Sequence, residues 1–434
     1  MERTIIEELI RWKESTQRKP LILWGARQTG KTWILREFGR TQFQDCLYVS
    51  FYNNKRMAQI FEEDYDVRRI INALEIETHT RITPEKTLII FDEVQNAGSV
   101  VESLKYFCED APEYAICAAG SLLGVALHEG ISFPVGKVDE LRLHPMSFEE
   151  FLRAVEEPAL AEYLSQGDAA RINEFLDRYT ELLKKYYVVG GMPEAVERFR
   201  TGGSYDAVRQ AQLSILHQYE GDFGKHIPPN EISRVRMVWN AVPAQLAKEN
   251  KKFFFGGIKK GARSREYETA IQWLIDAGLL HRVHKVAKPA LPLKAYLEPT
   301  SFKLFFLDVG LLGAMSELDP EMILQGNHAF TEFKGALTEQ YVQQELCART
   351  PYTLYYYASE KAAYEVDFLI QKDGDVTPIE VKAQENLKSH SLKVYHDKYG
   401  PKRSYRTSMA GYREQDWMTN IPLPAIQMIK KHGI

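Results

Sequence analysis

The sequence has few cysteines and no long apolar run. Its 434 residues include four cysteines, and no two of them form a C-x-x-C pair. This spacing argues against a zinc site and a disulfide framework, and a reducing cytoplasm fits it best. No apolar run approaches the roughly 18 residues of a membrane span. The N-terminal stretch also lacks the apolar core of a signal peptide. We therefore expect a cytoplasmic protein with no membrane partner.

A large net charge is also missing. The formal net charge is −4, with 26% charged and 44% hydrophobic residues. This balance argues against a protein that coats nucleic acid by charge alone, so any nucleic-acid surface must be a local basic patch. The apolar fraction is enough to offset the entropy of ordering, and we do not expect bulk disorder. Repeats and low-complexity tracts are absent, and the length predicts roughly two to four domains.

Short apolar runs recur in the first third of the chain, separated by stretches with helical periodicity. Strands that are apolar throughout are typical of a parallel sheet covered by helices. We therefore predict an α/β domain over residues 1–150. Its strands are expected at residues 21–24, 46–51, 87–91, 114–119 and 138–143.

The rest of the chain predicts three further parts. Residues 151–229 read as helices interrupted by glycines and a proline, which resembles a helical lid. Two helical stretches and two strand-like runs within residues 230–315 indicate a winged helix. A polar linker then leads to a helix and several strands, which predicts a separate C-terminal α/β domain over residues 326–434.

The segment GARQTGKT satisfies the P-loop pattern G-x-x-x-x-G-K-[ST]. It follows the expected strand at residues 21–24 and precedes a helical stretch, which argues against an accidental match. Its glycines let backbone amides and the helix N-terminus face a phosphate. We expect Lys31 to reach the β- and γ-phosphates of ATP and Thr32 to ligate Mg²⁺. The predicted nucleotide-binding residues are Gly25, Ala26, Arg27, Gln28, Thr29, Gly30, Lys31 and Thr32.

A second motif, LIIFDEV, ends a predicted buried strand in two carboxylates. Asp92 fits the position that holds Mg²⁺ through its water shell, and Glu93 fits a base that orients the attacking water. Acidic residues that merely cap a strand are the alternative. The strand at residues 46–51 lies between the two motifs in sequence. This arrangement resembles the additional-strand, catalytic-Glu division of P-loop ATPases.

Ser121 follows the next predicted strand, where AAA-type ATPases place a polar sensor that contacts the γ-phosphate or the lytic water. It is equally suited to be the N-cap of a helix over LLGVAL, and both interpretations stay open. No arginine finger is assigned. Lys137 has the required charge, but a solvated lysine is the simpler interpretation.

Five strings together resemble the bacterial and archaeal AAA-type ATP-binding proteins of uncharacterised function, which commonly end in a domain of unknown function. They are GARQTGKT, LIIFDEVQ, AAGSLLG, HPMSFEEFL and YYVVGGMPEAV. The resemblance covers essentially the whole chain. It implies an AAA core, a helical lid, a winged helix and a C-terminal nuclease-like fold. Because AAA-type cores usually act as rings, it also implies a homo-oligomer.

The stretch YEVDFLIQKDGDVTPIEVKA carries charges on both arms of an expected β-hairpin. The dipeptide Asp373-Gly374 favours a two-residue type I′ turn. In that register Asp367 faces Glu380 as a non-hydrogen-bonded pair, whose side chains lie closest together. Strand periodicity places Lys382 on the same face as Glu380. The hairpin therefore predicts that two carboxylates and a lysine converge.

This D…E-x-K constellation resembles the PD-(D/E)XK nuclease superfamily, which has a restriction-endonuclease-like fold. There the carboxylates hold Mg²⁺ and the lysine positions or polarises the attacking water. The resemblance implies Asp367, Glu380 and Lys382 as catalytic residues. It implies Glu339, the additional helical acid, as a metal ligand beside Asp367 and Glu380, and Glu365 lies on the same strand face as Asp367. A charged, soluble edge hairpin and an inactive binding module remain alternatives.

A basic run interleaved with three phenylalanines lies within the expected winged helix. It would precede and enter the recognition helix, where phosphate contacts are usual, so DNA is the expected partner. A structural winged helix with the phenylalanines in its core is the competing interpretation. A function of another class also remains, namely a nucleotide-controlled regulatory or defence switch that binds without cleaving. The basic residues are Lys248, Lys251, Lys252, Lys259, Lys260, Arg263 and Arg265.

Overall fold

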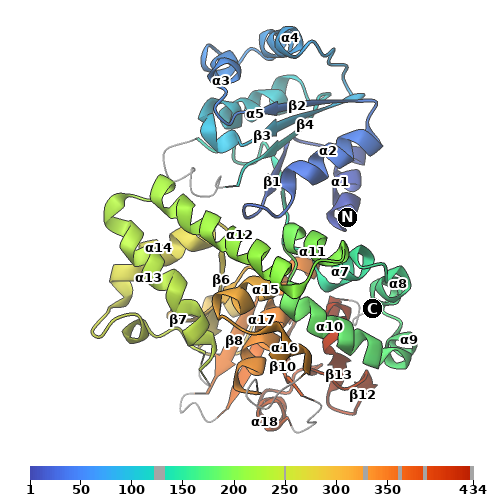
Figure 1. Cartoon of the computed structure of the whole chain (residues 1–434), viewed down its shortest axis with the longest axis vertical. Coiled ribbons are helices and arrows are strands. Elements are labelled where there is room, and N and C mark those ends of the chain that lie inside the picture. The colour runs from blue at the N-terminus through green and yellow to red at the C-terminus, as the bar shows by residue number, and fades with distance from the viewer. Residues whose placement is uncertain (122–131, 249–250, 326–330, 360–363, 385–388, 431–434) are drawn as a thin grey trace. The chain divides into compact units, whose positions relative to one another are not determined.

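The computed structural model describes residues 1–121, 132–248, 251–325, 331–359, 364–384 and 389–430. The chain divides into two compact units. The N-terminal unit comprises Glu2–His144 with Asp276–Gly278, and the C-terminal unit comprises Pro145–Ile275 and Leu279–Ile434 with Met1. Each unit has its own sheet (Figure 1). In the described part of the chain, no helix combines the length and the hydropathy that crossing a membrane requires.

The sheet of the N-terminal unit has five parallel strands in the order β2-β3-β4-β1-β5. Every residue of β3 and of β4 is buried, as expected for central strands covered on both faces. The predicted parallel α/β domain is therefore confirmed. The strands are β1 (Leu21–Trp24), β2 (Asp45–Ser50), β3 (Thr87–Asp92), β4 (Ala115–Ala119) and β5 (Asp139–Arg142).

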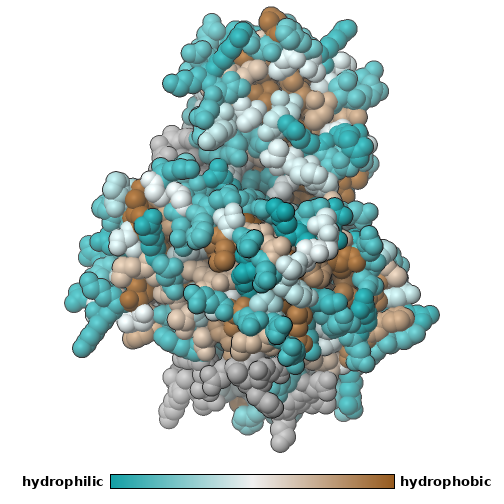
Figure 2. Space-filling model, viewed as in Figure 1, coloured by the Kyte–Doolittle hydropathy of each residue, from teal (hydrophilic) through white to brown (hydrophobic). Residues whose placement is uncertain are grey.

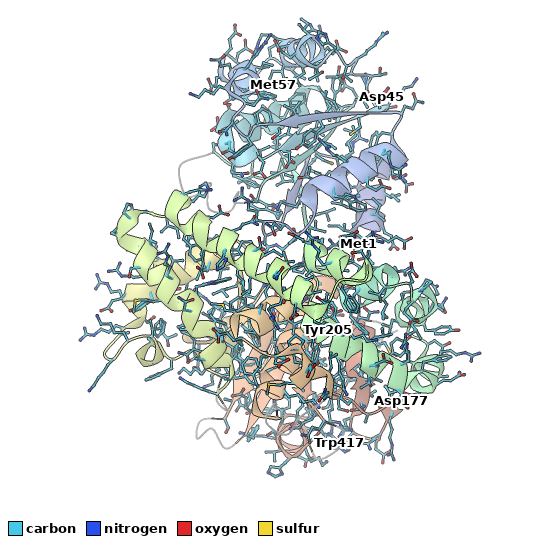
Figure 3. The ribbon with its side chains drawn as sticks, viewed as in Figure 1. Met1, Asp45, Met57, Asp177, Tyr205 and Trp417 are labelled. Carbon is cyan, nitrogen blue, oxygen red and sulfur yellow. The ribbon has the colours of Figure 1, made fainter. Side chains whose placement is uncertain are left out.

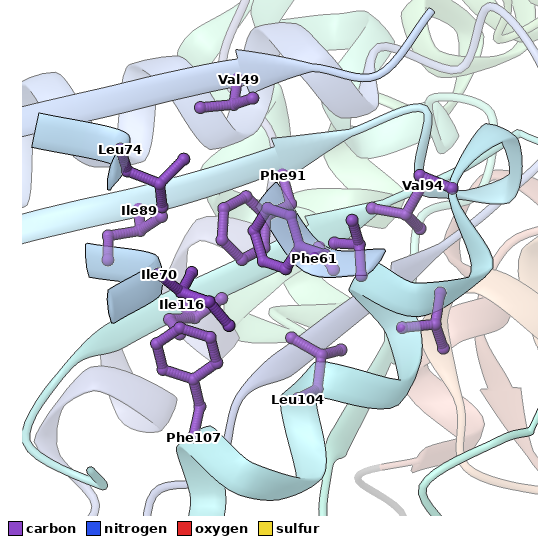
Figure 4. Packing of buried hydrophobic residues seen from close by; sticks show 14 of the residues in the cluster. Val49, Phe61, Ile70, Leu74, Ile89, Phe91, Val94, Leu104, Phe107 and Ile116 are labelled. Atoms are coloured by element: carbon purple, nitrogen blue, oxygen red, sulfur yellow. The ribbon is translucent and has the colours of Figure 1, made fainter. Parts of the chain in front are cut away.

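Helices cover both faces of this sheet. One layer consists of α1 (Ile5–Glu14) and α2 (Lys31–Gln42), which pack through residues such as Leu9 and Phe38. The other layer contains Phe61, Phe91 and Phe107, which Figure 4 shows close together. The Phe61 and Phe91 rings meet edge to face with centroids 5.4 Å apart. The elements of this second layer are α3 (Lys55–Glu62), α4 (Val67–Thr78), η1 (Val94–Asn96) and α5 (Gly98–Asp110).

The strand that separates β1 from β3 in the sheet is β4. The strand predicted at residues 46–51 is β2, and it lies at the sheet edge beside β3. Order along the chain does not fix order in a parallel sheet, because each helical crossover can pass over a neighbouring strand. The carboxyl ends of β1, β3 and β4 still meet at one edge. They bring together the segments that carry the P-loop, Asp92 and Ser121.

The first part of the C-terminal unit is helical, as predicted for residues 151–229. Its first helix begins with a capping box, in which Ser147 and Glu150 satisfy each other's backbone N–H groups. Asp177 lies in the first turn of α10 and Tyr205 begins α12 (Figure 3). The helices are α7 (Phe148–Ala154), α8 (Pro158–Gln166), α9 (Ala169–Glu174), α10 (Leu176–Val189), α11 (Pro193–Arg200) and α12 (Tyr205–His226).

Two helices and an antiparallel hairpin follow, in the chain order expected for a winged helix. The sheet extends beyond this hairpin, because β6 also pairs in parallel with β8 (Tyr355–Ala358). The elements are α13 (Pro229–Leu246), η3 (Phe255–Gly257), α14 (Ser264–Asp276), β6 (Leu280–Val286), η4 (Leu293–Tyr296), β7 (Leu297–Phe306), α15 (Val309–Met315) and α16 (Pro320–Gln325).

One mixed sheet of eight strands, in the order β12-β13-β11-β10-β9-β8-β6-β7, therefore crosses the predicted boundary between residues 230–315 and 326–434. The division into domains there stays a prediction. Part of the predicted linker at residues 316–327 is α16, and residues 326 and 327 lie outside the described residues. The remaining elements are α17 (Thr331–Arg349), β8 (Tyr355–Ala358), β9 (Glu365–Lys372), β10 (Asp375–Val381), α18 (His390–Tyr399), β11 (Tyr405–Ser408), β12 (Arg413–Glu414), β13 (Thr419–Pro422) and η6 (Leu423–Lys430).

The paired glycines of YYVVGGMPEAV join three segments of the C-terminal unit. The N–H of Gly191 donates to Asp308 Oδ2 at 2.6 Å, and its carbonyl oxygen accepts from Met146 N at 2.7 Å. Asp308 also caps α15, because its Oδ1 accepts from Leu311 N at 2.9 Å. Gly190 has φ 72°, a left-handed conformation that favours glycine. The contacts of the two glycines therefore explain why the fold needs them at this position.

Gly190→Ala is expected to lower the free energy of unfolding by about 2–4 kcal/mol, because strain and a clash combine. A Cβ at Gly190 would lie 2.2 Å from Asp308 Oδ1. Gly202 is the matched control, since its φ is 81° and a Cβ there would meet nothing within 4 Å. Gly202→Ala should cost only about 1–2 kcal/mol. Urea unfolding followed by tryptophan fluorescence measures both, and equal losses would contradict the clash.

Candidate functional site

The P-loop connects β1 to α2 and contains three residues with positive φ. They are Gly25 (φ 153°), Gln28 (φ 65°) and Gly30 (φ 95°), and α2 begins at the next residue, Lys31. A Cβ at Gly25 would lie 2.5 Å from the carbonyl oxygen of Leu143. The first glycine of the motif is thus required by its conformation and by a close backbone contact.

Lys31 lies across its own loop. Its Nζ donates to the carbonyl oxygens of Gly25 and Ala26, both at 2.8 Å. Burial lowers the pKa of Lys31 to about 8, while the carboxylates of Glu93 and Asp92 act in the opposite direction. The ammonium group is therefore held next to the backbone amides that would face a phosphate.

The side chains of Thr29 and Arg3 stabilise the P-loop backbone through hydrogen bonds. The buried Thr29 hydroxyl donates to Ala26 O at 2.9 Å. Arg3 donates through Nη1 to Thr29 O at 2.9 Å and through Nη2 to His144 O at 2.6 Å. Arg3 was not among the predicted site residues, and nothing in its local sequence indicates this role.

Thr32 and Asp92, the two predicted Mg²⁺ ligands, lie together. Thr32 Oγ1 donates to Asp92 Oδ2 at 2.7 Å. The same oxygen accepts from the Tyr48 hydroxyl at 2.9 Å, and Asp92 Oδ1 accepts from Glu93 N at 2.9 Å. A hydroxyl beside a carboxylate, next to a lysine and a helix N-terminus, is a donor set that suits a nucleotide phosphate with Mg²⁺. Tyr48 was not predicted, although it precedes the polar end of β2 by two residues.

Glu93 lies beside Ser121, and the sensor role of Ser121 stays a prediction. Ser121 Oγ donates to Glu93 Oε2 at 3.4 Å, and Gln95 Nε2 donates to the same oxygen. Glu93 has φ 54°, a conformation that costs free energy for a residue other than glycine and is found most often at functional sites. The alternative role of Ser121 involves a helix within residues 122–131, which lie outside the described residues. Lys137 forms an ion pair with Glu109 at 2.8 Å.

The predicted hairpin register in the C-terminal unit is confirmed. Asp373 (φ 51°) and Gly374 (φ 70°) form the turn, and the pairs run from Lys372–Asp375 to Phe368–Ile379. The next pair outward would be Asp367 with Glu380. At that point Asp367 Oδ2 accepts a hydrogen bond from Val381 N at 2.7 Å, so this carboxylate binds the backbone of the facing strand.

Three carboxylates from α17 and β9 converge, and we call them the carboxylate cluster. They are Glu339, Glu365 and Asp367, each of which offers an oxygen within 4.8 Å of the others. Two lysines accompany them. Lys303 Nζ lies 3.0 Å from Glu339 Oε1 and 2.6 Å from Glu365 Oε1, and Lys251 forms an ion pair with Glu339. The carboxylate cluster is therefore in contact with two lysine side chains.

The charges of the cluster depend on one another. Burial raises the pKa of Asp367, and the neighbouring Glu339 carboxylate raises it further. Burial also acts to raise the pKa of Glu339, but Lys251 and Lys303 hold it below its usual value. Burial acts to lower the pKa of Lys303, and the nearby carboxylates outweigh that effect and raise it. Lys251 and Lys303 thus pair with Glu339 and Glu365, while the pKa of Asp367 lies above its usual range.

Glu380 of β10 and Lys382, which follows that strand, form a separate pair with Glu380 Oε1 and Lys382 Nζ 2.7 Å apart. The other carboxylate oxygen of Glu380 is buried and accepts no hydrogen bond from the described residues. Of the predicted metal ligands here, the structure groups Glu339 and Asp367 with Glu365, and it places Glu380 beside Lys382. Lys303 was not predicted. Its only signal is a lysine in the otherwise apolar run KLFFL.

Three family models match separate parts of the chain. Residues 17–152 match the AAA domain family. Residues 180–322 match a domain of unknown function (DUF8612), and residues 334–426 match another (DUF4143). Among curated proteins, no relative matches this sequence.

Several solved structures are similar to the chain at low identity. The Walker-type ATPase of Pyrococcus abyssi is 15% identical, with a TM-score of 0.43 over 73% of this chain and 95% of that chain. The Orc1 protein of Aeropyrum pernix, solved in complex with DNA, is 15% identical, with a TM-score of 0.32 over 73% and 93%. RuvB of Thermotoga maritima is 15% identical, with a TM-score of 0.29 over 65% and 90%. Similarity at this level does not indicate what the chain binds.

The family match and the site geometry agree on one region. Residues 17–152 contain the P-loop, the parallel sheet and the carboxylates of LIIFDEV. These findings support membership of this region in an AAA-type ATPase family.

Proposed function

We propose that this chain is a Mg²⁺-dependent ATPase that acts on DNA. The observation that carries the ATPase part is the contact between Thr32 and Asp92 at 2.7 Å, next to Lys31 and Glu93. Lys31 and the P-loop amides bind the phosphates of ATP, and Thr32 and Asp92 hold Mg²⁺, which neutralises charge on the transferred phosphoryl group.

In this proposal Glu93 orients the water that attacks the γ-phosphorus. The new bond joins the water oxygen to phosphorus, the bond to the bridging oxygen of ADP breaks, and Glu93 accepts the water proton. Ser121 and Gln95 fix the Glu93 carboxylate through hydrogen bonds to Oε2. A homo-oligomer, in which a neighbouring subunit supplies an arginine finger, is part of this proposal.

The DNA part of the proposal rests on the C-terminal unit. The basic run precedes and enters α14, the helix that the winged-helix prediction makes the recognition helix, and the carboxylate cluster offers oxygen ligands to a divalent cation. Glu339, Glu365 and Asp367 would hold Mg²⁺ there. Glu380 of β10 and the adjacent Lys382 would orient the water that attacks a phosphodiester.

A second candidate is a nucleotide-controlled switch whose C-terminal unit binds DNA or a partner without cleaving it. The ion pairs of Lys251 and Lys303 with the carboxylate cluster favour this candidate, because two cations already neutralise the acids. A divalent ion would have to displace at least one of them.

A paired assay tests both candidates. Wild type, Lys31→Ala and Asp367→Asn are incubated with Mg²⁺, ATP and supercoiled plasmid, with Lys137→Ala as a control outside the P-loop. We expect Lys31→Ala to reduce ATP turnover at least ~100-fold, because the phosphate-binding cation is lost. Nicking should disappear in Asp367→Asn while its ATP turnover persists.

The outcomes separate the two candidates. ATP turnover without nicking by the wild type would favour the switch. A wild type that does not hydrolyse ATP would overturn the ATPase proposal itself.

A further inference from the structure

Three consecutive phenylalanines in the basic run differ in their surroundings. Phe253 is buried and stacks on Phe302 with ring centroids 5.8 Å apart. Phe255 packs edge to face on Phe253 at 5.3 Å. Phe254, between them, is 63% exposed. A purely structural role in the core therefore accounts for two of the three rings and leaves Phe254 without an explanation.

The backbone that carries the exposed ring is held in place. Gln245 of α13 is buried, and its side-chain amide bonds both backbone groups of Phe254. Gln245 Nε2 donates to Phe254 O at 2.9 Å, and Phe254 N donates to Gln245 Oε1 at 3.2 Å. On the other side, Phe253 N donates to Phe302 O at 2.8 Å. An exposed ring on a fixed backbone loses little conformational entropy when it binds a ligand.

Two glycines permit this arrangement. A Cβ at Gly256 would lie 2.6 Å from Phe254 Cε1 and Cζ, so the ring extends over the Gly256 backbone. A Cβ at Gly257 would lie 2.5 Å from Gln245 Nε2. The order FFFGG in the sequence therefore fits one rotamer of Phe254 and the amide contacts of Gln245.

Basic residues predominate around the ring in the sequence. Lys248 Nζ lies 5.8 Å from the centroid of Phe254, and the one acidic residue in the sequence from 248 to 265 is Glu249. Over α13 and α14, Figure 2 shows hydrophilic side chains with separate hydrophobic ones among them. The exposed basic residues around the loop are Lys248, Lys252, Lys259, Lys260, Arg263 and Arg265.

An open groove of about 700 Å³ continues from this loop along α13. Gly257 and Ile258 line it next to the loop. On the helix its lining combines the polar residues Ser233, Arg236 and Asn240 with the apolar residues Pro229, Ile232, Met237, Ala241 and Ala244. Hydrogen-bond donors and a guanidinium group thus extend the basic surface beyond Phe254. We call Lys248 and residues 251–260, together with this groove, the Phe254 surface.

We propose that the Phe254 surface binds single-stranded DNA, an inference that rests on the proposed action on DNA. An unpaired base stacks on Phe254, and the lysines bind the phosphates. Base stacking on an aromatic ring and charge along the backbone are the two components of single-strand binding. A duplex does not offer a free base face, so this surface prefers single strands.

The test is fluorescence anisotropy with a labelled oligomer of roughly 15 thymidines and with a hairpin duplex of similar length. Phe254→Ala should weaken binding of the oligomer by about 10- to 100-fold and leave duplex binding within about twofold. Phe254→Trp should retain the affinity, and its added tryptophan fluorescence should be quenched by the oligomer. Tyr52→Ala is the matched control, because Tyr52 is 60% exposed and lies outside the surface.

The outcomes distinguish this inference from the proposed function. If Phe254→Ala binds the oligomer as tightly as wild type does, stacking on Phe254 is wrong while action on DNA stands. If wild type binds neither oligomer nor duplex, both are wrong. If Phe254→Ala changes the sedimentation coefficient of the protein and not its DNA affinity, the ring is a contact between copies of this chain, and the inference is overturned.

Discussion

Glu93→Gln is expected to stop ATP turnover and to leave nucleotide binding intact. Glutamine has the shape of glutamate, but it cannot accept the proton of the attacking water. Loss of a general base typically lowers the rate by about 10²- to 10⁴-fold. Phosphate release at saturating ATP measures turnover, and titration with a fluorescent ATP analogue measures binding. The dissociation constant should stay within about threefold of the wild-type value.

The geometry identifies Glu93 rather than Asp92 as the base. Both oxygens of the Asp92 carboxylate already accept hydrogen bonds, Oδ2 from Thr32 and Tyr48 and Oδ1 from the backbone of Glu93. These donors already occupy the Asp92 carboxylate, which leaves less of it free to bind the attacking water. The Glu93 carboxylate is held by the neutral side chains of Ser121 and Gln95. Ser121 and Gln95 orient the Glu93 carboxylate and leave it able to bind the attacking water.

Glu113→Gln is the control for the charge change, because Glu113 is exposed in the same unit. It should hydrolyse ATP at the wild-type rate. Wild-type turnover by Glu93→Gln would show that another group activates the water. Loss of ATP binding in Glu93→Gln would instead show that the carboxylate supports the P-loop.

The local sequence predicted those features that depend on near neighbours. Strands β1 to β4 of the N-terminal unit follow from apolar runs that are long enough for a strand and too short for a helix, whereas β5 has the polar sequence DELR. The P-loop is recognised by a contiguous motif, and the sequence already places it between a strand and a helix. The hairpin register follows from the turn at Asp373-Gly374, because a two-residue turn fixes every pair along both arms.

Long-range pairing could not be predicted in the same way. Nothing within residues 280–286 indicates that β6 pairs with β8, which begins at Tyr355. Lys251 and Lys303 belong to segments predicted as a different domain from Glu339 and Glu365, so their ion pairs were not expected. Periodicity reports which face of an element is buried, and it does not report which element covers that face.

The second large effect concerns the buried Lys303. Replacing it with methionine is expected to lower the free energy of unfolding by about 3–5 kcal/mol, because the buried Glu339 keeps only Lys251 as a counter-charge and Glu365, which is 30% exposed, loses its ion pair. Lys303 is fully buried, and its ammonium contacts Glu339 and Glu365 at 3.0 and 2.6 Å. Urea unfolding of wild type and Lys303→Met in EDTA measures this loss.

Lys285→Met is the matched control on the neighbouring strand. Lys285 also forms an ion pair, with Glu298 at 3.0 Å, but its side chain is 20% exposed and that of Glu298 is 31% exposed. An ion pair that water reaches contributes only about 0–1 kcal/mol. A similar loss in both variants would mean that lysine packing, and not the buried charges, determines the stability.

The same variant also tests whether the carboxylate cluster holds a divalent cation. Without Lys303 the cluster has one lysine for its three acids, so Mn²⁺ or Mg²⁺ should bind it and stabilise the folded state. A cation at about 100 times its dissociation constant would restore about 2.7 kcal/mol. Combining Lys303→Met with Glu339→Gln should remove that rescue, because one ligand is lost. If Lys303→Met gains no more stability from Mn²⁺ than wild type does, the cluster is a closed ion-pair network, and the switch becomes the better account of the C-terminal unit.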